Sequence, residues 1–246
     1  MKFVCSFLFV LLVGFCQGGV SFQLDARKGV ATTESNVVWS ALQGMRVVGE
    51  RAEWQRVDDG IVNVAGAEAG ALVFEEGEGV VRSMVMVVRC GASLRMRETL
   101  ICGERVFRLA GRPENEVSGN VVGRFERGGF CEVESWKVDG VEGAELEAGR
   151  TQLVEVVFPM GLTLSRMGLG SDVGRKEWRR AWGGGFCEVI GFDEVPSDSA
   201  LAGMRHYLNL KWELGLEMGS TAAERSAASG AGVHLGKVFA TLFMVR

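Results

Sequence analysis

The stretch that decides the fold lies near the C-terminus, at Gly185–Trp212, and reads GFCEVIGFDEVPSDSALAGMRHYLNLKW. Its first part, Glu188–Phe192, is apolar with β-branched residues at its centre, which is typical of a buried strand. Pro196 follows it, and proline favours a turn because it cannot donate a ladder hydrogen bond. The segment therefore predicts a strand, a turn and a new element that begins near Ser197.

That new element is predicted to be a helix. Ser197 can cap its N-terminus, and Asp198 in the first turn interacts favourably with the helix dipole. Apolar residues recur at i, i+3, i+7 and i+11 and form one face, Leu201, Met204, Leu208 and Trp212. We expect this face to pack on the preceding sheet, with about 2–3 kcal/mol or more from burial of the Trp212 indole.

Short apolar runs separated by glycine-rich or charged turns fill the rest of the chain. The chain has 246 residues, enough for a substantial core, and 35 glycines but only 3 prolines. Strands are predicted at Ile61–Val64, Ala71–Phe74, Ser83–Val88, Leu100–Leu109, Val121–Phe125, Cys131–Val138 and Leu153–Phe158. Many short strands with turn signals between them are typical of an all-β sandwich or barrel.

The N-terminus reads as a secretory signal peptide over residues 1–18. Lys2 precedes the apolar run Phe3–Phe15, and small residues surround a cleavage point after Gly18. The run is too short to span a bilayer. A lipoprotein signal cleaved before Cys16 is the alternative, although a large residue precedes that cysteine. We therefore expect a secreted, periplasmic or cell-surface protein.

The C-terminal tail, residues 217–246, follows the predicted helix. We expect a short helix at Thr221–Ser229 and a terminal strand at Val238–Val245, an apolar run too short for a membrane anchor. This strand either completes a sheet or forms an edge that pairs with another protein. The mature chain is thus predicted to have no transmembrane segment. The net charge of −4 also argues against a nucleic-acid partner.

Export would leave four cysteines in an oxidising compartment, namely Cys90, Cys102, Cys131 and Cys187. Four cysteines permit two disulfides with three connectivities. The sequence GGFCEV occurs twice, at Gly128–Val133 and Gly184–Val189. If these two strands are neighbours, Cys131–Cys187 is the first bridge to test. Buried free thiols in strands are the alternative.

Residues at both ends of the predicted sandwich resemble a known family. FQLDA at Phe22–Ala26 and VVW at Val37–Trp39 stand near the N-terminus, and the stretch quoted above stands near the C-terminus. Together they resemble bacterial LamG-like domains of the concanavalin A-like lectin–glucanase type, over about residues 20–216. The segment Trp136–Val141 resembles a hairpin of that family. The residues that carry the resemblance are Asp25, Trp39, Glu188, Asp193 and Trp212.

The resemblance implies a two-sheet antiparallel jelly-roll sandwich with one C-terminal amphipathic helix packed on it. Because glycoside hydrolases also use this fold, paired carboxylates are candidate catalytic acids. Glu132 and Glu134 share a face of a predicted strand, about 6–7 Å apart, and Trp136 continues that face. Retaining glycosidases of this fold typically carry a third acid after the pair, and none follows Glu134 at the expected positions, so the match is only partial. The alternative is a solvated strand face, and we expect no catalysis.

A basic and aromatic stretch, RKEWRRAW at Arg175–Trp182, precedes the closing strand. Arginine side chains can hold carboxylate or sulfate groups, and tryptophans can stack on sugar rings. The candidate ligand-binding residues are Arg175, Trp178, Arg179, Arg180 and Trp182. A solvated loop whose tryptophans fold over the sheet edge is the alternative.

Cofactors are not predicted, although calcium is possible in relatives of this fold. Asp58, Asp59, Asp139 and Asp172 could supply oxygen ligands, but each also fits an ordinary turn. The sequence as a whole predicts an exported, non-catalytic LamG-like module that binds a glycan or a cell-envelope component. A glycoside hydrolase and a structural protein-interaction module remain the alternatives.

Overall fold

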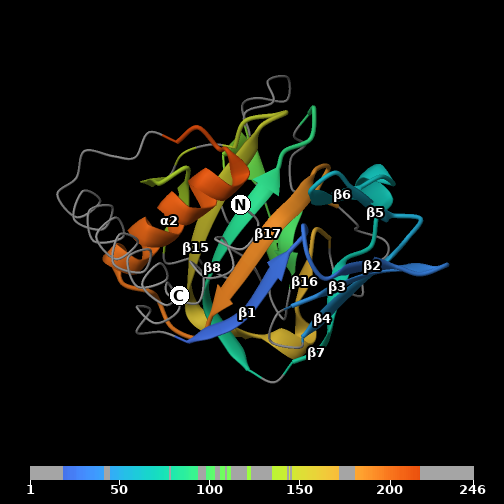
Figure 1. Ribbon diagram of the computed structural model, residues 1–246, viewed down its shortest axis with the longest axis horizontal. Helices are drawn as coiled ribbons and strands as arrows, with labels where there is room; N and C mark the ends of the chain where they lie inside the picture. Colours follow the sequence, from blue (N-terminus) through green and yellow to red (C-terminus); the bar gives the residue numbers. More distant parts are fainter. Residues whose placement is uncertain are drawn as a thin grey trace, which may run out of the picture. The chain divides into compact units, whose positions relative to one another are not determined.

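The structure is a computed structural model, shown in Figure 1. It describes residues 19–41, 45–77, 79–93, 98–102, 106–108, 110–111, 121–122, 135–142, 144, 146–171 and 181–216. The chain divides between Val195 and Pro196 into two compact units. The unit Gly19–Val195 contains the strands, and the described part of the other unit contains a helix.

An eight-stranded antiparallel sheet forms one layer of the β unit. Its order is β14 (Val141–Glu142), β13 (Ser135–Val138), β15 (Thr151–Thr163), β8 (Val80–Arg89), β17 (Gly185–Phe192), β6 (Gly60–Asn63) and β5 (Trp54–Val57), and β1 (Val20–Asp25) pairs with β17. The neighbours come from distant parts of the chain, as in a jelly roll. The closing strand β17 thus contacts β8, β6 and β1.

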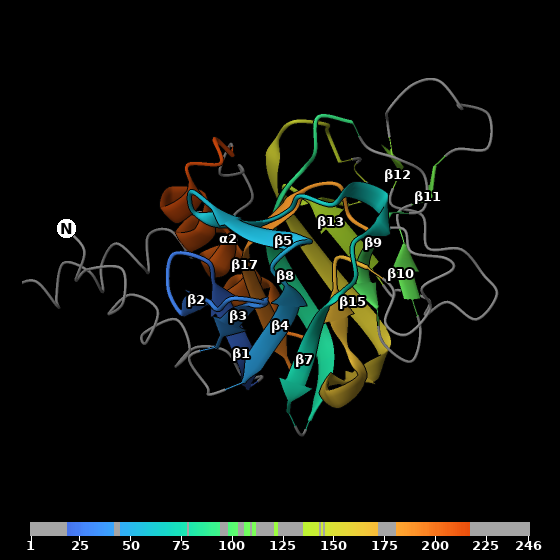
Figure 2. The same cartoon turned by 90° about the vertical axis from the view of Figure 1, so that its right-hand side faces the viewer.

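A seven-stranded sheet forms the second layer (Figure 2). Its order is β10 (Val106–Arg108), β9 (Thr99–Cys102), β16 (Gly168–Leu169), β7 (Leu72–Glu76), β4 (Arg46–Glu50), β3 (Asn36–Ser40) and β2 (Val30–Thr32). Two short strands, β11 (Ala110–Gly111) and β12 (Val121–Val122), pair with each other. Short 3₁₀ turns occur at η1 (Gly66–Glu68) and η2 (Leu164–Arg166).

The hydrophobic core lies between the two sheets. The rings of Phe22 on β1 and Phe74 on β7 meet edge to face, with centroids 5.1 Å apart. Trp39 on β3 and Trp54 on β5 are fully buried, and the Trp54 indole donates to the Gly70 carbonyl at 2.8 Å. Aromatic side chains from both layers therefore hold the sandwich together.

The central strands of the eight-stranded sheet are buried on both faces. All residues of β17 are buried, including Ile190, which alternates with the core residue Val189. On β8, Val87 is as fully buried as the core residue Met86. This explains why these strands read as continuous apolar runs instead of alternating polar and apolar residues.

The hairpin predicted around Trp136–Val141 is present. Val138 pairs with Val141 across β13 and β14, so Asp139 and Gly140 form a two-residue turn. Both turn residues have positive φ, 53° and 82°, as a type I′ turn requires. The Asp139 carboxylate also accepts a hydrogen bond from the Leu153 amide at 2.9 Å, which fixes the turn to β15.

The other unit contains helix α2 (Asp198–Trp212), which begins where the sequence predicts. The Ser197 hydroxyl accepts a hydrogen bond from the Ala200 amide at 3.3 Å and so caps the helix. The predicted apolar face is only partly correct. Met204 and Leu208 are buried, but Leu201 and Trp212 are half-buried, and Tyr207 is buried in their place.

Most of the predicted strands exist, although their bounds differ. Leu100–Leu109 was predicted as one strand, but β9 and β10 form a hairpin within this range. The strands β12 and β13 lie within the predicted ranges Val121–Phe125 and Cys131–Val138, and the remaining residues of both ranges lie outside the described residues. The signal region 1–18 and the tail 217–246 lie outside the described residues. In the part of the chain that the structure describes, the predicted fold class is confirmed: two antiparallel β layers and a single C-terminal α-helix.

Candidate functional site

A group of charged side chains gathers where four strands of the eight-stranded sheet meet. Arg27 and Lys28 directly follow β1, Asp58 and Asp59 connect β5 to β6, and Arg89 ends β8. We call these five residues the rim cluster. The register brings them together, because Asp25 pairs with Glu188, Phe186 with Ile61, and Gly185 with Arg89.

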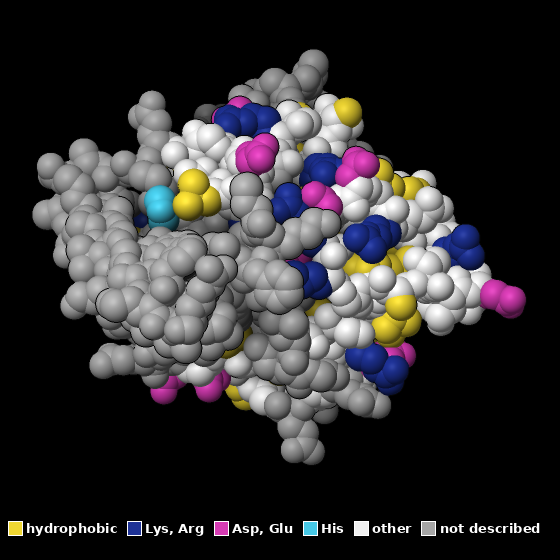
Figure 3. All heavy atoms as spheres, viewed as in Figure 1, with side chains coloured by type: hydrophobic (Ala, Val, Ile, Leu, Met, Phe, Trp, Pro, Cys, Tyr) yellow, Lys and Arg dark blue, Asp and Glu magenta, His cyan; other side chains and the backbone are white. Residues whose placement is uncertain are grey.

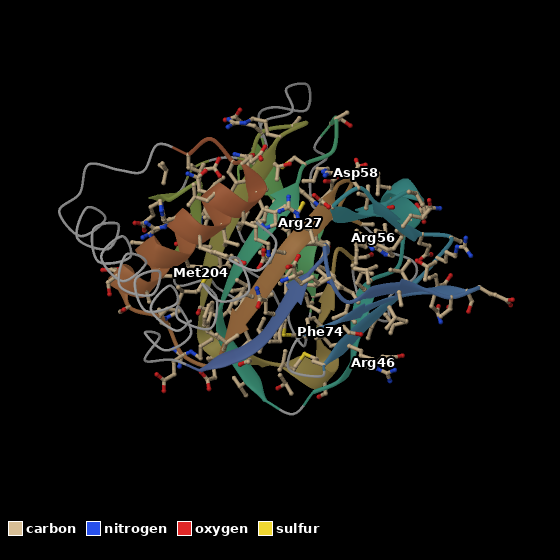
Figure 4. The ribbon with its side chains drawn as sticks, in the orientation of Figure 1. Arg27, Arg46, Arg56, Asp58, Phe74 and Met204 are labelled. Atoms are coloured by element: carbon tan, nitrogen blue, oxygen red, sulfur yellow. The ribbon has the colours of Figure 1, made fainter. Side chains whose placement is uncertain are left out.

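The rim cluster consists of ion pairs. The Arg27 Nε lies 3.0 Å from Asp59 Oδ2, and the Arg89 Nη1 lies 4.0 Å from Asp58 Oδ2. The side chains are well exposed, from 34% for Arg89 to 83% for Asp58. Exposed pairs of this kind contribute about 0–1 kcal/mol to stability. The pairs therefore add little to the stability of the fold. Figure 4 labels Arg27 and Asp58 near the upper end of β17, and Figure 3 shows basic and acidic side chains mixed on the same face of the molecule.

Two buried carboxylates lie beside the rim cluster. Asp25 on β1 and Glu188 on β17 are direct cross-strand partners, with 4% and 0% exposure. The Gln23 side-chain amide donates to Glu188 Oε1 at 2.6 Å, and the Arg27 backbone amide donates to Asp25 Oδ1 at 3.0 Å. The Lys28 ammonium lies 3.9 Å from Asp25 Oδ2. These contacts offset part of the cost of placing two acids opposite each other.

Cys187 is the extra residue of a β-bulge in β17. Phe186 pairs with Val88 and Glu188 with Val87, so Cys187 has no partner on β8. Burial raises the pKa of its thiol to about 11, although Arg89 and Arg27 lower this pKa in part. The thiol is therefore protonated at neutral pH and is a poor nucleophile.

A second polar cluster surrounds Cys90 at the end of β8. Its thiol lies 3.8 Å from Gln152 Oε1, and the Gln152 amide donates to Asp139 Oδ2 at 2.9 Å. Burial, together with the nearby acids Asp139 and Glu98, raises the pKa of the Cys90 thiol to about 12. These contacts link β8, the β13–β14 turn and the start of β15, and we interpret them as structural.

No disulfide joins the cysteines that the structure describes. Cys90, Cys102 and Cys187 are buried free thiols, the alternative that the sequence left open. Cys131, the predicted partner of Cys187, lies outside the described residues. Cys187 lies at the rim cluster and Cys90 in the Gln152–Asp139 network, so the two thiols belong to different polar groups.

Of the predicted ligand-binding residues, the structure describes only Trp182. Its side chain is fully buried in the core, and its indole nitrogen lies 3.4 Å from the Gly185 carbonyl oxygen. The prediction that this tryptophan stacks on a sugar is therefore wrong, because the ring has no exposed face. Arg175, Trp178, Arg179 and Arg180 lie outside the described residues.

The predicted carboxylate pair, Glu132 and Glu134, also lies outside the described residues. Trp136, predicted to continue their face, is half-buried against the core. Among the family-like residues, Trp39 is fully buried and Asp193 is exposed, with its amide donating to the Gly19 carbonyl at 3.2 Å. These residues fill the core or join strand ends.

The possible calcium ligands have other partners. Asp58 and Asp59 pair with arginines, and Asp139 accepts hydrogen bonds from Leu153 and Gln152. Asp172 lies outside the described residues. Within the ranges described, no group of three or more histidines, cysteines or acids is placed to hold a metal ion. The same ranges contain no helix with the length and hydrophobicity needed to cross a bilayer.

The sequence indicated Asp25 and Glu188 only as part of a family-like motif, and it gave no sign of Arg27 or Arg89. Their proximity depends on the pairing of β1 with β17 and of β17 with β8, which are distant from each other in the sequence. Comparisons with protein-family models and with curated proteins find no match for this chain. The LamG-like resemblance thus stays a prediction.

Proposed function

We propose that this chain is an exported, non-catalytic binding module of the LamG-like type, which recognises a glycan or another component of the cell envelope. The signal-like residues 1–18 support export. The rim cluster supports binding, and it is the observation on which the proposal depends most.

The rim cluster has the properties of a polar recognition site. Arg27 and Asp59 form one pair, Arg89 and Asp58 another, and all four side chains extend from strand ends or a short turn. Arg89 lies on β8, whereas Arg27, Asp58 and Asp59 lie in turns that adjoin the strands β1, β5 and β6. The paired strands hold the ends of these turns and so limit where the donors and acceptors can lie. Hydroxyl-rich ligands such as glycans are bound by few, well-placed polar groups of this kind.

The described carboxylates favour binding over hydrolysis. A retaining glycosidase needs two accessible carboxyl groups about 5–5.5 Å apart, with the scissile bond between them. Asp25 and Glu188 are close in the sheet, but both are almost completely buried, so a sugar has no access to the space between them. They are suited to holding the strand ends that carry the rim cluster.

A glycan array with the full chain tests the proposal, run once with calcium and once with a chelator. We expect retention of one glycan class, lost in the double variant Arg27→Ala/Arg89→Ala. Arg56→Ala is the matched control, because Arg56 is an exposed arginine on β5 outside the ion pairs of the rim cluster. Unchanged binding in the double variant would show that the rim cluster is not the site.

Two further variants test the alternatives. If the rim variant still binds and Trp178→Ala/Arg179→Ala does not, the ligand site is the basic and aromatic stretch predicted from the sequence. If the chain releases reducing sugar, and Glu132→Gln or Glu134→Gln abolishes this release, the chain is a hydrolase and the proposal is wrong. If neither binding nor turnover occurs and the chain co-purifies with another exported protein, it is a structural interaction module.

A further inference from the structure

The first strand of the β unit starts at the point where the sequence predicts cleavage of a signal peptide. The unit spans Gly19–Val195, and β1 begins at Val20, directly after the first residue that would follow the cut. Within the described sheets β1 pairs with β17, in a register that places Val20 opposite Phe192. The start of β1 therefore depends on its contacts with the end of β17.

Asp193, the residue after β17, makes such a contact with Gly19. Its backbone amide donates a hydrogen bond to the Gly19 carbonyl oxygen at 3.2 Å. Its carboxylate lies beside the Gly19 Cα, because a Cβ atom built on this glycine would be 2.9 Å from Oδ2 and 3.2 Å from Oδ1. Two bonds of about 1.5 Å separate that Cβ position from the Gly19 nitrogen, so this nitrogen is at most about 6 Å from Oδ2. A positive charge on the nitrogen would interact with the carboxylate at this distance.

The geometry singles out Asp193 among the nearby acids. Apart from Gly19 and its chain neighbours, the three heavy atoms nearest to the built Cβ position all belong to the Asp193 carboxyl group. The Asp193 side chain is exposed and takes part in none of the ion pairs found among the described residues. Its negative charge is therefore available to a cation at residue 19.

Cleavage after Gly18 would create this cation. In the uncleaved chain the Gly19 nitrogen belongs to a neutral peptide bond. Hydrolysis of the Gly18–Gly19 bond consumes one water molecule and leaves a carboxylate on Gly18 and an amine on Gly19. An α-amine ordinarily has a pKa of about 7.7–8.0, so most of it is protonated at neutral pH.

We propose that removal of residues 1–18 by a signal peptidase creates an ion pair between the α-ammonium group of Gly19 and the Asp193 carboxylate. This inference rests on the export proposed above. The ion pair adds a charge contact to the backbone hydrogen bond between the same two residues, and so fastens the first strand of the mature chain to the closing strand β17. Processing thus stabilises the start of β1 through a group that the uncleaved chain lacks.

Expression of the full chain in an exporting bacterial host tests the proposal. Intact mass and N-terminal sequencing of the exported protein should show Gly19 as the first residue. Acetylation at about pH 6.5, where lysine side chains stay protonated, then removes the charge of the α-amine. Hydrogen exchange of the Asp193 amide, measured by NMR as a protection factor, reports on the start of β1, because this amide donates to Gly19.

Acetylation and the variant Asp193→Asn should each lower the protection factor about two- to fivefold, as expected for an exposed ion pair. Acetylation of Asp193→Asn should cause no further loss, because both changes remove the same pair. Glu194→Gln is the matched control, since it removes the neighbouring exposed acid. In this control acetylation should lower the protection factor as much as in the wild type.

Three results would overturn the proposal, and they separate it from the proposed function. If the exported protein begins at another residue, Gly19 has no α-ammonium group. If the protein begins at Gly19 but acetylation has no effect, or has the same effect in Asp193→Asn, the ion pair is wrong while export and binding stand. If the chain keeps residues 1–18 and stays inside the cell, the export in the proposed function is wrong as well.

Discussion

Gln23 and Glu188 are 165 residues apart in the chain, and the side-chain amide of the first donates a hydrogen bond of 2.6 Å to the carboxylate of the second. Both side chains are at least 98% buried, as Gln23 has 2% exposure and Glu188 none. The bond joins β1 to the closing strand β17 beside the rim cluster. The stability of this corner of the sheet therefore depends on a polar contact inside the protein.

Replacing Gln23 by Leu should destabilise the fold, because the buried Glu188 carboxylate then loses the hydrogen bond from the Gln23 amide. We expect the free energy of unfolding to fall by about 1–3 kcal/mol. Urea denaturation measures this change. Gln55→Leu on the exposed strand β5 is the matched control and should cost less than about 0.5 kcal/mol. Equal losses in both variants would contradict a special role for the Gln23–Glu188 bond.

The thiols of Cys90 and Cys187 should resist alkylation in the folded protein. Both are buried, and burial raises their pKa values to about 12 and about 11, so little thiolate exists at pH 8. Iodoacetamide treatment followed by peptide mass spectrometry checks this. The same peptides should react completely after unfolding in guanidinium. Rapid labelling of either cysteine without denaturant would show that the thiol is accessible.

The raised thiol pKa of Cys187 also predicts a loss of stability in alkaline solution. The folded protein keeps the proton up to a pKa of about 11, whereas the unfolded chain releases it near 9.0. The contribution of the Cys187 thiol to the free energy of unfolding is therefore fully present below pH 9.0. It falls by about 1.4 kcal/mol per pH unit as the pH rises toward 11.

Urea unfolding at several pH values above 9 measures this slope in the wild type and in Cys187→Ala. Cys187→Ala should show a shallower fall of the unfolding free energy with pH than the wild type. Cys102→Ala is the matched control: it retains Cys187 and should have the same slope as the wild type. An identical slope in wild type and Cys187→Ala would mean that other groups cause the alkaline loss.

Two glycines should respond differently to alanine. A Cβ at Gly184 would lie 1.9 Å from the Arg89 carbonyl oxygen, so Gly184→Ala forces the backbones of β17 and β8 apart. A Cβ at Gly149 would meet nothing within 4 Å, but its φ of 74° is unfavourable for alanine. We expect Gly149→Ala to cost about 1–2 kcal/mol and Gly184→Ala more. Thermal unfolding compares them, and a smaller cost at Gly184 would contradict the predicted clash.

The fold class could be read from local patterns. β-branched runs predicted β6, β7, β8, β15 and β17, and Ser197 correctly marked the start of α2. These features depend on neighbouring residues, which a single sequence displays. The split of Leu100–Leu109 into two strands is not predicted, because both halves have strand-like composition, although Gly103 between them is a turn signal.

The candidate site could not be predicted in the same way. Arg27 with Asp59, and Arg89 with Asp58, meet only because β1, β6 and β8 all converge on one end of β17. Pairing order in a sheet is a property of the whole chain. Trp182 shows the opposite error, since a tryptophan in a basic segment suggested a ligand platform but the ring is needed in the core.

The bulge at Cys187 is the place where the closing strand β17 can change its length by one residue. Phe186 and Val189 both belong to the core although three positions separate them, and the unpaired residue absorbs the mismatch with β8. Deleting Cys187 would leave Phe186 and Val189 two positions apart, so a strand with regular alternation would still turn both side chains toward the core. Homologous chains should therefore differ by a single-residue gap at this point more readily than anywhere else along β17.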